Sequence, residues 1–124
     1  MKKEYRVKKN EDFQVIFKKG KSVANRQFVL YSLKKEQQDH FRIGISVSKK
    51  LGNAVKRNYI KRCIRKFFQD YQDHLLAGHD YLVIARKPTS EMDFAEMEKS
   101  LIHVTRLGKV LRKPTNESKK VTKK

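Results

Sequence analysis

The apolar residues of this chain fall into segments with two different periods. From Asn53 to Leu76 they recur about every fourth residue in two neighbouring rows, which predicts one long amphipathic helix. The other positions of this segment are mostly cationic, so we expect the helix to have one core face and one basic face. The first apolar row is Val55, Tyr59, Cys63, Phe67 and Tyr71, and the second is Ile60, Ile64, Phe68 and Leu75.

Three other segments have the pattern of β-strands. Arg26 to Lys35 alternates between two faces, Phe41 to Ser48 alternates between an apolar and a polar face, and Tyr81 to Ala85 is a short apolar run. The polar face of the second segment is small at its centre, which leaves room for a ligand against the sheet. A plain solvent-facing surface explains that pattern equally well. This face consists of Arg42, Gly44, Ser46 and Ser48.

Two shorter helices are predicted at the ends of this region. Asn10 has the position of an N-cap, and the helix that follows it ends at Gly20. Asp93 and Glu96 have the spacing of a capping box, and the helix that they begin ends near Gly108. The segments follow as a helix, two or three strands, a helix, a strand and a helix. We take the order to be α-β-β-β-α-β-α, which predicts an α+β fold, a small helix–sheet sandwich. We expect a basic arm at 1–9, one domain at 10–108 and a basic, disordered tail at 109–124.

Charge indicates what the basic face binds. The chain has 31 Lys and Arg against 13 Asp and Glu, a net charge of +18 and a pI near 10.2. Like charges at helical spacing repel one another, and a polyanion, most simply a nucleic acid, relieves that repulsion. A solvated charged face and an anionic membrane surface are the competing explanations, but no segment approaches transmembrane length. The N-terminus lacks the apolar run of a signal peptide, so we expect a cytoplasmic protein.

The residue types that serve nuclease chemistry are sparse. Cys63 is the single cysteine and lies in the apolar row, so we expect a core residue rather than a metal ligand. A protein-centred nuclease needs clustered carboxylates or histidines, and the chain offers one modest group near the end of the basic helix. We expect Asp70 and Asp73 to be solvated and Asp80 to begin the strand that follows, rather than to form a catalytic or metal site. The group consists of Asp70, Asp73, His74, His79 and Asp80.

The segment from Ser46 to Lys66 makes the chain recognisable. It contains Ser46-Val47-Ser48-Lys49-Lys50-Leu51-Gly52-Asn53 and then Arg57-Asn58-Tyr59-Ile60-Lys61-Arg62-Cys63-Ile64-Arg65. This pattern closely resembles the signature of the bacterial ribonuclease P protein component. Further segments are similar to that family, so the resemblance covers roughly residues 5–108. They are Arg6, Lys8–Phe13, Phe17–Gly20, Ser22–Arg26 and Val83–Pro88.

The resemblance implies a fold and a division of labour. The fold is a helix–sheet sandwich with a left-handed βαβ crossover through the basic helix, whereas the general rule favours the right hand. In this family a large RNA subunit holds the catalytic Mg²⁺ and cleaves precursor tRNA at the mature 5′ end. The protein binds that RNA and the single-stranded 5′ leader. The resemblance implies no catalytic residue, cofactor or metal on this chain, and no obligate protein partner.

Residue roles follow from the same resemblance. The residues implied to bind the RNA subunit are Lys50, Asn53, Lys56, Arg57, Asn58, Lys61, Arg62 and Arg65. The residues implied to line a cleft for the leader are Phe13, Phe17, Tyr31 and Ser46. Spacing alone favours core positions for the two phenylalanines, and only the resemblance assigns them to a cleft. The alternative functions are a general basic RNA-binding protein, ribosomal or chaperone-like, without a ribozyme partner, and a protein-only nuclease.

Overall fold

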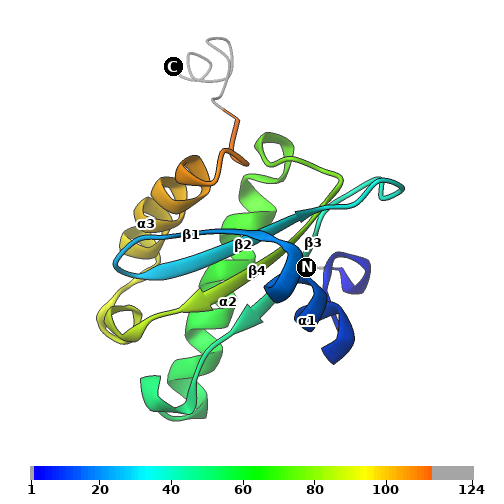
Figure 1. Cartoon of the computed structure of the whole chain (residues 1–124). Helices are drawn as coiled ribbons and strands as arrows, with labels where there is room; N and C mark the ends of the chain where they lie inside the picture. The colour runs from blue at the N-terminus through cyan, green and yellow to red at the C-terminus, as the bar shows by residue number, and fades with distance from the viewer. Residues whose placement is uncertain (1, 113–124) are drawn as a thin grey trace, which may run out of the picture.

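The computed structural model describes residues 2–112, which form a four-stranded sheet and three α-helices (Figure 1). The predicted order α-β-β-β-α-β-α is confirmed. Four short 3₁₀ turns connect these elements: η1 (Lys3–Tyr5), η2 (Lys49–Leu51), η3 (Gln72–His74) and η4 (Lys87–Glu91). The helices and strands are α1 (Asn10–Lys19), β1 (Lys21–Ala24), β2 (Phe28–Lys34), β3 (Arg42–Ser46), α2 (Ala54–Asp70), β4 (His79–Ala85) and α3 (Phe94–Leu107).

The strands lie in the order β1-β2-β4-β3, so β3 and β1 form the edges of the sheet. All neighbours are antiparallel except β3 and β4, which run parallel and are joined through α2. In Figure 1, α2 lies behind the sheet as the chain passes from β3 to β4, and the crossover has the left hand that the resemblance implies.

The two faces of the sheet pack against different helices. On one face, α2 and α3 close the main core, which includes Phe28, Leu30 and Tyr81 from the strands. On the other face, α1 closes a smaller core of Val7, Ile16 and Leu82. Figure 1 shows the resulting layers, with α1 in front of the sheet and α2 behind it. Because α1 is only ten residues long, this second face is covered in part.

The ends of two helices differ from the sequence expectation. Lys9 is the N-cap of α1, and Asn10 is already its first helical residue, so Asn10 makes no cap. The basic helix begins after Asn53 as predicted but ends at Asp70, six residues before Leu76. Tyr71 leaves the helical conformation, with φ −103° and ψ 17°, and a 3₁₀ turn follows. Leu75 then forms a β-bridge with Leu111, which holds this stretch in an extended form.

The first apolar row of the basic helix is only partly buried. Cys63 and Phe67 belong to the main core, but the side chain of Tyr59 is 39% exposed and that of Val55 is 78% exposed. Four residues turn an α-helix by about 400°, so a row at this spacing drifts by about 40° with each step. Its N-terminal members therefore reach the solvent side, and the prediction that they are core residues is wrong.

Packed residues extend on both sides of the expected range 10–108. Val7 and Val110 are both buried, and Arg6 forms a parallel β-bridge with Ile43 at the edge of the sheet. Residues 109–112 of the predicted tail thus lie against the domain, and Val110 belongs to its main core. The rest of the predicted tail, 113–124, lies outside the described residues.

Candidate nucleic-acid interface

The basic face of α2 is a row of cations at helical spacing, Arg57, Lys61 and Arg65, with Asn58 and Arg62 beside it. The sequence favours a helix here because Asn53 caps it: its Oδ1 accepts a hydrogen bond from the Lys56 backbone N–H at 2.9 Å. Arg62 and Asn58 are exposed, and the three residues of the row are partly exposed. All five side chains are therefore accessible to a large ligand.

These cations lack acidic neighbours. From Ala54 to Gln69, α2 contains no Asp or Glu. Salt bridges engage Lys35, Arg42 and Lys66, and none of these three residues belongs to the basic face. Burial lowers the pKa of Arg65, and the positive charge of Arg6 lowers it further. Like charges are thus held close together, and an anion that binds among them lowers the free energy of the site.

Three of the residues predicted to bind RNA lie outside this face or already use their side chains in other hydrogen bonds. Lys56 points away from it and donates a hydrogen bond from Nζ to the Ser90 carbonyl at 2.6 Å. The side-chain oxygen of Asn53 is occupied by the helix cap. Lys50 lies in η2, before the helix, and is exposed. The structure therefore brings together Arg57, Asn58, Lys61, Arg62 and Arg65, and leaves the other three around the start of α2.

An aromatic surface lies where α1 leaves the sheet uncovered. The Phe17 side chain is 56% exposed, and its ring centroid is 5.0 Å from that of Tyr31 on β2. Ser46 is exposed on the adjoining part of the same sheet face, where it pairs with Ile84. The four residues predicted for the leader cleft thus share one face of the sheet, formed with α1. The expectation from spacing that Phe17 is a core residue is wrong.

Phe13 differs from Phe17 because it packs onto the sheet. It is partly buried beside the smaller core, and a Cβ at Gly44 would lie 2.4 Å from its ring. Gly44, the small residue at the centre of the polar face of β3, therefore makes room for the ring of Phe13. It also sets how closely α1 approaches the sheet, and so positions Phe17 beside Tyr31.

An ion-pair network holds α1 in that place. Asp80 on β4 is buried and accepts hydrogen bonds from Arg42 Nε at 2.9 Å and Nη2 at 2.6 Å. Arg42 also lies 3.6 Å from the Asp12 carboxylate of α1. Burial alone would raise the pKa of Asp80, but hydrogen bonds from Arg42 and Gln38 lower it below its ordinary value. Sequence reasoning missed this network because its members are far apart along the chain.

The carboxylates and histidines near the end of α2 do not point to a common site. Asp80 is engaged by Arg42, and Asp70 pairs with Lys66 at 3.0 Å. His79 stacks against the Tyr81 ring at 5.8 Å. Within residues 2–112 there is no cluster of three or more His, Cys, Asp or Glu that could hold a metal ion. Cys63 is buried, as predicted, and burial raises the pKa of its thiol.

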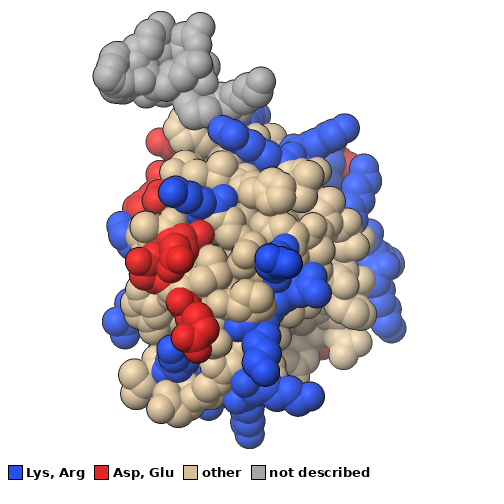
Figure 2. All heavy atoms as spheres, turned by 90° about the vertical axis from the view of Figure 1, so that its left-hand side faces the viewer, with Lys and Arg blue, Asp and Glu red and all other residues tan. Residues whose placement is uncertain are grey.

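Acidic residues gather on the side of the molecule that carries α3. Figure 2 shows them grouped along one side of this face, with Lys and Arg along its other edges. Glu91, Asp93, Glu96 and Glu98 all belong to α3 or to the segment that leads into it. The charge of the chain is therefore uneven. Among the described residues, no helix is both long enough and apolar enough to cross a membrane.

Known proteins match the chain across both of these surfaces. The family model described as Ribonuclease P matches residues 1–108, which include the whole basic face and the aromatic surface. The chain belongs to the ribonuclease P protein family. It is 59% identical over 119 residues to the ribonuclease P protein component of Listeria welshimeri, covering 96% of this chain and all of that one. The corresponding protein of Geobacillus kaustophilus is 58% identical over 113 residues, covering 91% and 93%.

Solved structures of ribonuclease P proteins share the fold. The protein from Staphylococcus aureus, 56% identical, superposes with a TM-score of 0.83 over 87% of this chain and 98% of that one. The Thermotoga maritima protein, 37% identical, gives 0.74 over 82% and 96%. The chain is therefore the protein component of an endoribonuclease holoenzyme of tRNA 5′ maturation, with an RNA partner.

Proposed function

We propose that the basic face of α2 binds the catalytic RNA of ribonuclease P, and that the aromatic surface of α1 and the sheet binds the 5′ leader of precursor tRNA. One observation carries the proposal: the row Arg57, Lys61 and Arg65 has no salt bridge within residues 2–112, and a separate aromatic pair, exposed at Phe17, lies on the opposite face of the sheet. A protein with two such surfaces can hold two RNA segments at once.

The chemistry of the basic face suits a folded RNA. Arginine forks at Arg57, Arg62 and Arg65 match phosphate geometry in two-point contacts, while Lys61 supplies a mobile point charge. Asn58 is exposed among them and offers an amide to a ribose hydroxyl or a base edge. Each neutralised phosphate releases counterions, so we expect the affinity to fall steeply with salt. Lys50, Asn53 and Lys56 contribute at the border of this surface.

The chemistry of the aromatic surface suits a single strand. Unpaired bases stack on aromatic faces, which contributes roughly 1–3 kcal/mol per base and depends little on sequence. Phe17 and Tyr31 present such faces side by side, and Ser46 offers a hydroxyl close by. Phe13 acts chiefly by supporting α1. This surface gives the holoenzyme a preference for precursor over mature tRNA, because only the precursor has a leader.

The protein contributes binding rather than a catalytic side chain. Mg²⁺ held by the RNA subunit would supply the chemistry of metal-assisted hydrolysis, and none of it would be held by this chain. The protein promotes that step by holding the leader and by lowering electrostatic repulsion between the two RNAs. It acts in the cytoplasm, without a membrane and without an obligate protein partner.

A comparison of two RNAs tests the proposal against a general RNA-binding protein. The affinity of the chain is measured for the cognate RNA subunit and for a folded non-cognate RNA of the same length at the same salt. We expect at least a tenfold preference for the cognate RNA, because shape and spacing of phosphates must match the row on α2. Equal affinities would support a general basic RNA-binding protein instead.

A further inference from the structure

The row on α2 continues past its last cation into two amides. Gln69 lies one helical turn beyond Arg65, and Gln72 follows three residues later in η3. Both side chains are exposed. The same side of the helix therefore changes from guanidinium and ammonium groups, which bind phosphate, to amides, which carry both a hydrogen-bond donor and an acceptor.

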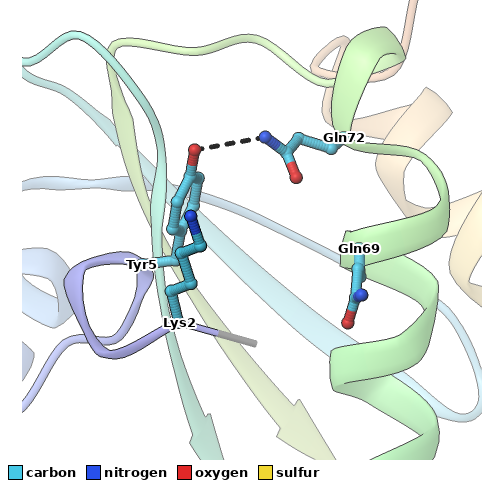
Figure 3. Close-up of a pocket in the computed structure, with 4 residues that line it drawn as sticks. All are labelled: Lys2, Tyr5, Gln69 and Gln72. Atoms are coloured by element: carbon cyan, nitrogen blue, oxygen red, sulfur yellow. Dashed lines mark hydrogen bonds between the residues drawn. The ribbon is translucent and has the colours of Figure 1, made fainter.

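These amides line a pocket of about 480 Å³ together with Lys2 and Tyr5. Figure 3 shows Lys2 and Tyr5 on one side, from the N-terminal turn, and Gln69 and Gln72 across from them at the end of α2. The Gln72 amide donates a hydrogen bond to the Tyr5 hydroxyl at 3.2 Å. The volume lies in the range of roughly 300–1,000 Å³ typical of small-ligand sites, and none of the four lining residues is acidic.

The tyrosine of this pocket is held in place by its neighbours. Its ring stacks on His40 with centroids 4.2 Å apart and meets Phe41 edge-on at 5.5 Å. An aromatic side chain that is already ordered loses little conformational entropy when a ligand binds. The pocket thus combines a fixed aromatic group with amides, as in sites that bind an unpaired base of RNA.

A basic cavity adjoins the pocket along α2. Arg6, the residue after Tyr5, lines this cavity with Lys61 and Arg65 of the basic face and with Ile43–Ile45 of β3. Both arginines line this cavity, so their like charges are held close together. Burial lowers the pKa of Arg65, and the charge of Arg6 lowers it further. A phosphate between them would relieve this repulsion. Tyr5, the residue before Arg6, and Gln69, one helical turn after Arg65, belong to the neighbouring pocket.

We propose that the pocket between η1 and the end of α2 binds the base of one unpaired nucleotide of the RNA subunit, while a phosphate of that nucleotide lies on Arg6 and Arg65. The inference rests on the proposed function, because it extends the RNA contact of the basic face. Gln69 and Gln72 hydrogen-bond to the edge of the base, Tyr5 packs against it, and Lys2 contacts the backbone on its far side.

Probing of the RNA subunit by 2′-hydroxyl acylation, with and without the full-length protein, tests this inference. The test variant is Gln69→Leu with Gln72→Leu, which removes the amides at exposed positions and keeps their bulk. The matched control is Gln37→Leu, at an exposed position in the β2–β3 connection. We expect wild type and control to protect an unpaired nucleotide that the test variant leaves reactive, with the remaining protections unchanged. We also expect about tenfold weaker binding by the test variant.

The outcomes separate the two proposals. If the wild-type protein protects no part of the RNA subunit, the proposed function fails and the pocket has no RNA partner. If the wild-type protein protects the RNA and the test variant gives the same protections and affinity, the pocket inference alone is overturned. Thermal unfolding of both variants, followed by circular dichroism, checks that a lost protection does not come from a lost fold.

Discussion

Phe17 is the side chain on which leader binding depends most directly. It is exposed, whereas the neighbouring aromatic residue of the same helix, Phe13, is partly buried, and the ring of Phe17 lies beside Tyr31. Sequence spacing could not separate Phe13 from Phe17, because both lie on one side of a short helix. The difference comes from β3, where Gly44 admits the ring of Phe13 to the sheet. The ring of Phe17 is exposed because α1 covers only part of this face of the sheet.

Replacement of Phe17 by Ala tests this role. We expect the holoenzyme to bind precursor tRNA about 5- to 150-fold more weakly, because one stacking platform of roughly 1–3 kcal/mol is lost. Binding of mature tRNA should not change, because it has no leader. The measurement is the dissociation constant of each tRNA with the assembled holoenzyme. Val15→Ala, at another exposed apolar position of α1, is the control. Equal losses for both tRNAs would contradict the assignment.

Asp80 provides a second residue-scale prediction, concerning stability. Asp80→Asn keeps the shape of the side chain but removes the buried charge to which Arg42 donates two hydrogen bonds, and leaves the more distant Asp12 as its acidic partner. We therefore expect a loss of about 3 kcal/mol in unfolding free energy. The pKa of Asp80 is lowered in the folded state. Its contribution is therefore complete above the unfolded-state value of about 4, and is lost as the pH falls through the lower folded value.

Urea unfolding over a series of pH values measures this contribution. The difference in unfolding free energy between wild type and Asp80→Asn should be constant near neutral pH and should shrink below about pH 4. A difference that stays the same at every pH would show that the charge of Asp80 does not stabilise the fold.

At the scale of elements, patterns within one segment predicted most of the local structure correctly. Features that depend on contacts between distant segments could not be predicted. The capping box of Asp93 and Glu96 is confirmed by both reciprocal hydrogen bonds, because a cap depends on residues three apart. The first strand, β1, could not be located from the sequence. It has four residues and only Val23 faces the core, so its pairing with β2 defines it. The end of α2 likewise depends on the distant Leu111.

Asn53 shows how one element combines a structural and a proposed RNA-binding role. Asn53→Ala should destabilise the protein by about 1 kcal/mol, because the cap of α2 is lost. Asn53→Ser keeps a capping oxygen and should retain stability, but it lacks the amide and should bind the RNA subunit more weakly. Chemical denaturation and RNA titration of the two variants check these expectations. Full RNA affinity of a stable Asn53→Ser protein would show that Asn53 acts only as the helix cap.

At the scale of the whole molecule, the distribution of charge matters more than its sum. The net charge was evident from the sequence, and the helical spacing of Arg57, Lys61 and Arg65 predicted their common face. The order β1-β2-β4-β3 was not predictable, because strands distant in sequence pair in it. That order places β3 at one edge of the sheet, while α3, which carries acidic residues, packs near β1 and β2 towards the other edge.

The salt dependence of RNA binding tests this asymmetry. Replacing Arg57 and Arg62 by Ala should reduce the slope of log affinity against log salt by about 1.5, because two phosphate contacts are lost. Lys99→Ala with Arg106→Ala removes the same charge from exposed positions on α3 and should leave the slope nearly unchanged. The slope is obtained from titrations of the RNA subunit at several salt concentrations. Equal reductions in both double variants would favour binding by net charge alone.

Cleavage of a precursor tRNA at low Mg²⁺ tests the central claim most directly. The three reactions contain the cognate catalytic RNA alone, this protein alone, and both together. We predict correct 5′ processing only when both are present, because the protein holds the RNA partners and the RNA performs the chemistry. Cleavage by the protein alone, or no gain when it is added to the RNA, would contradict this account.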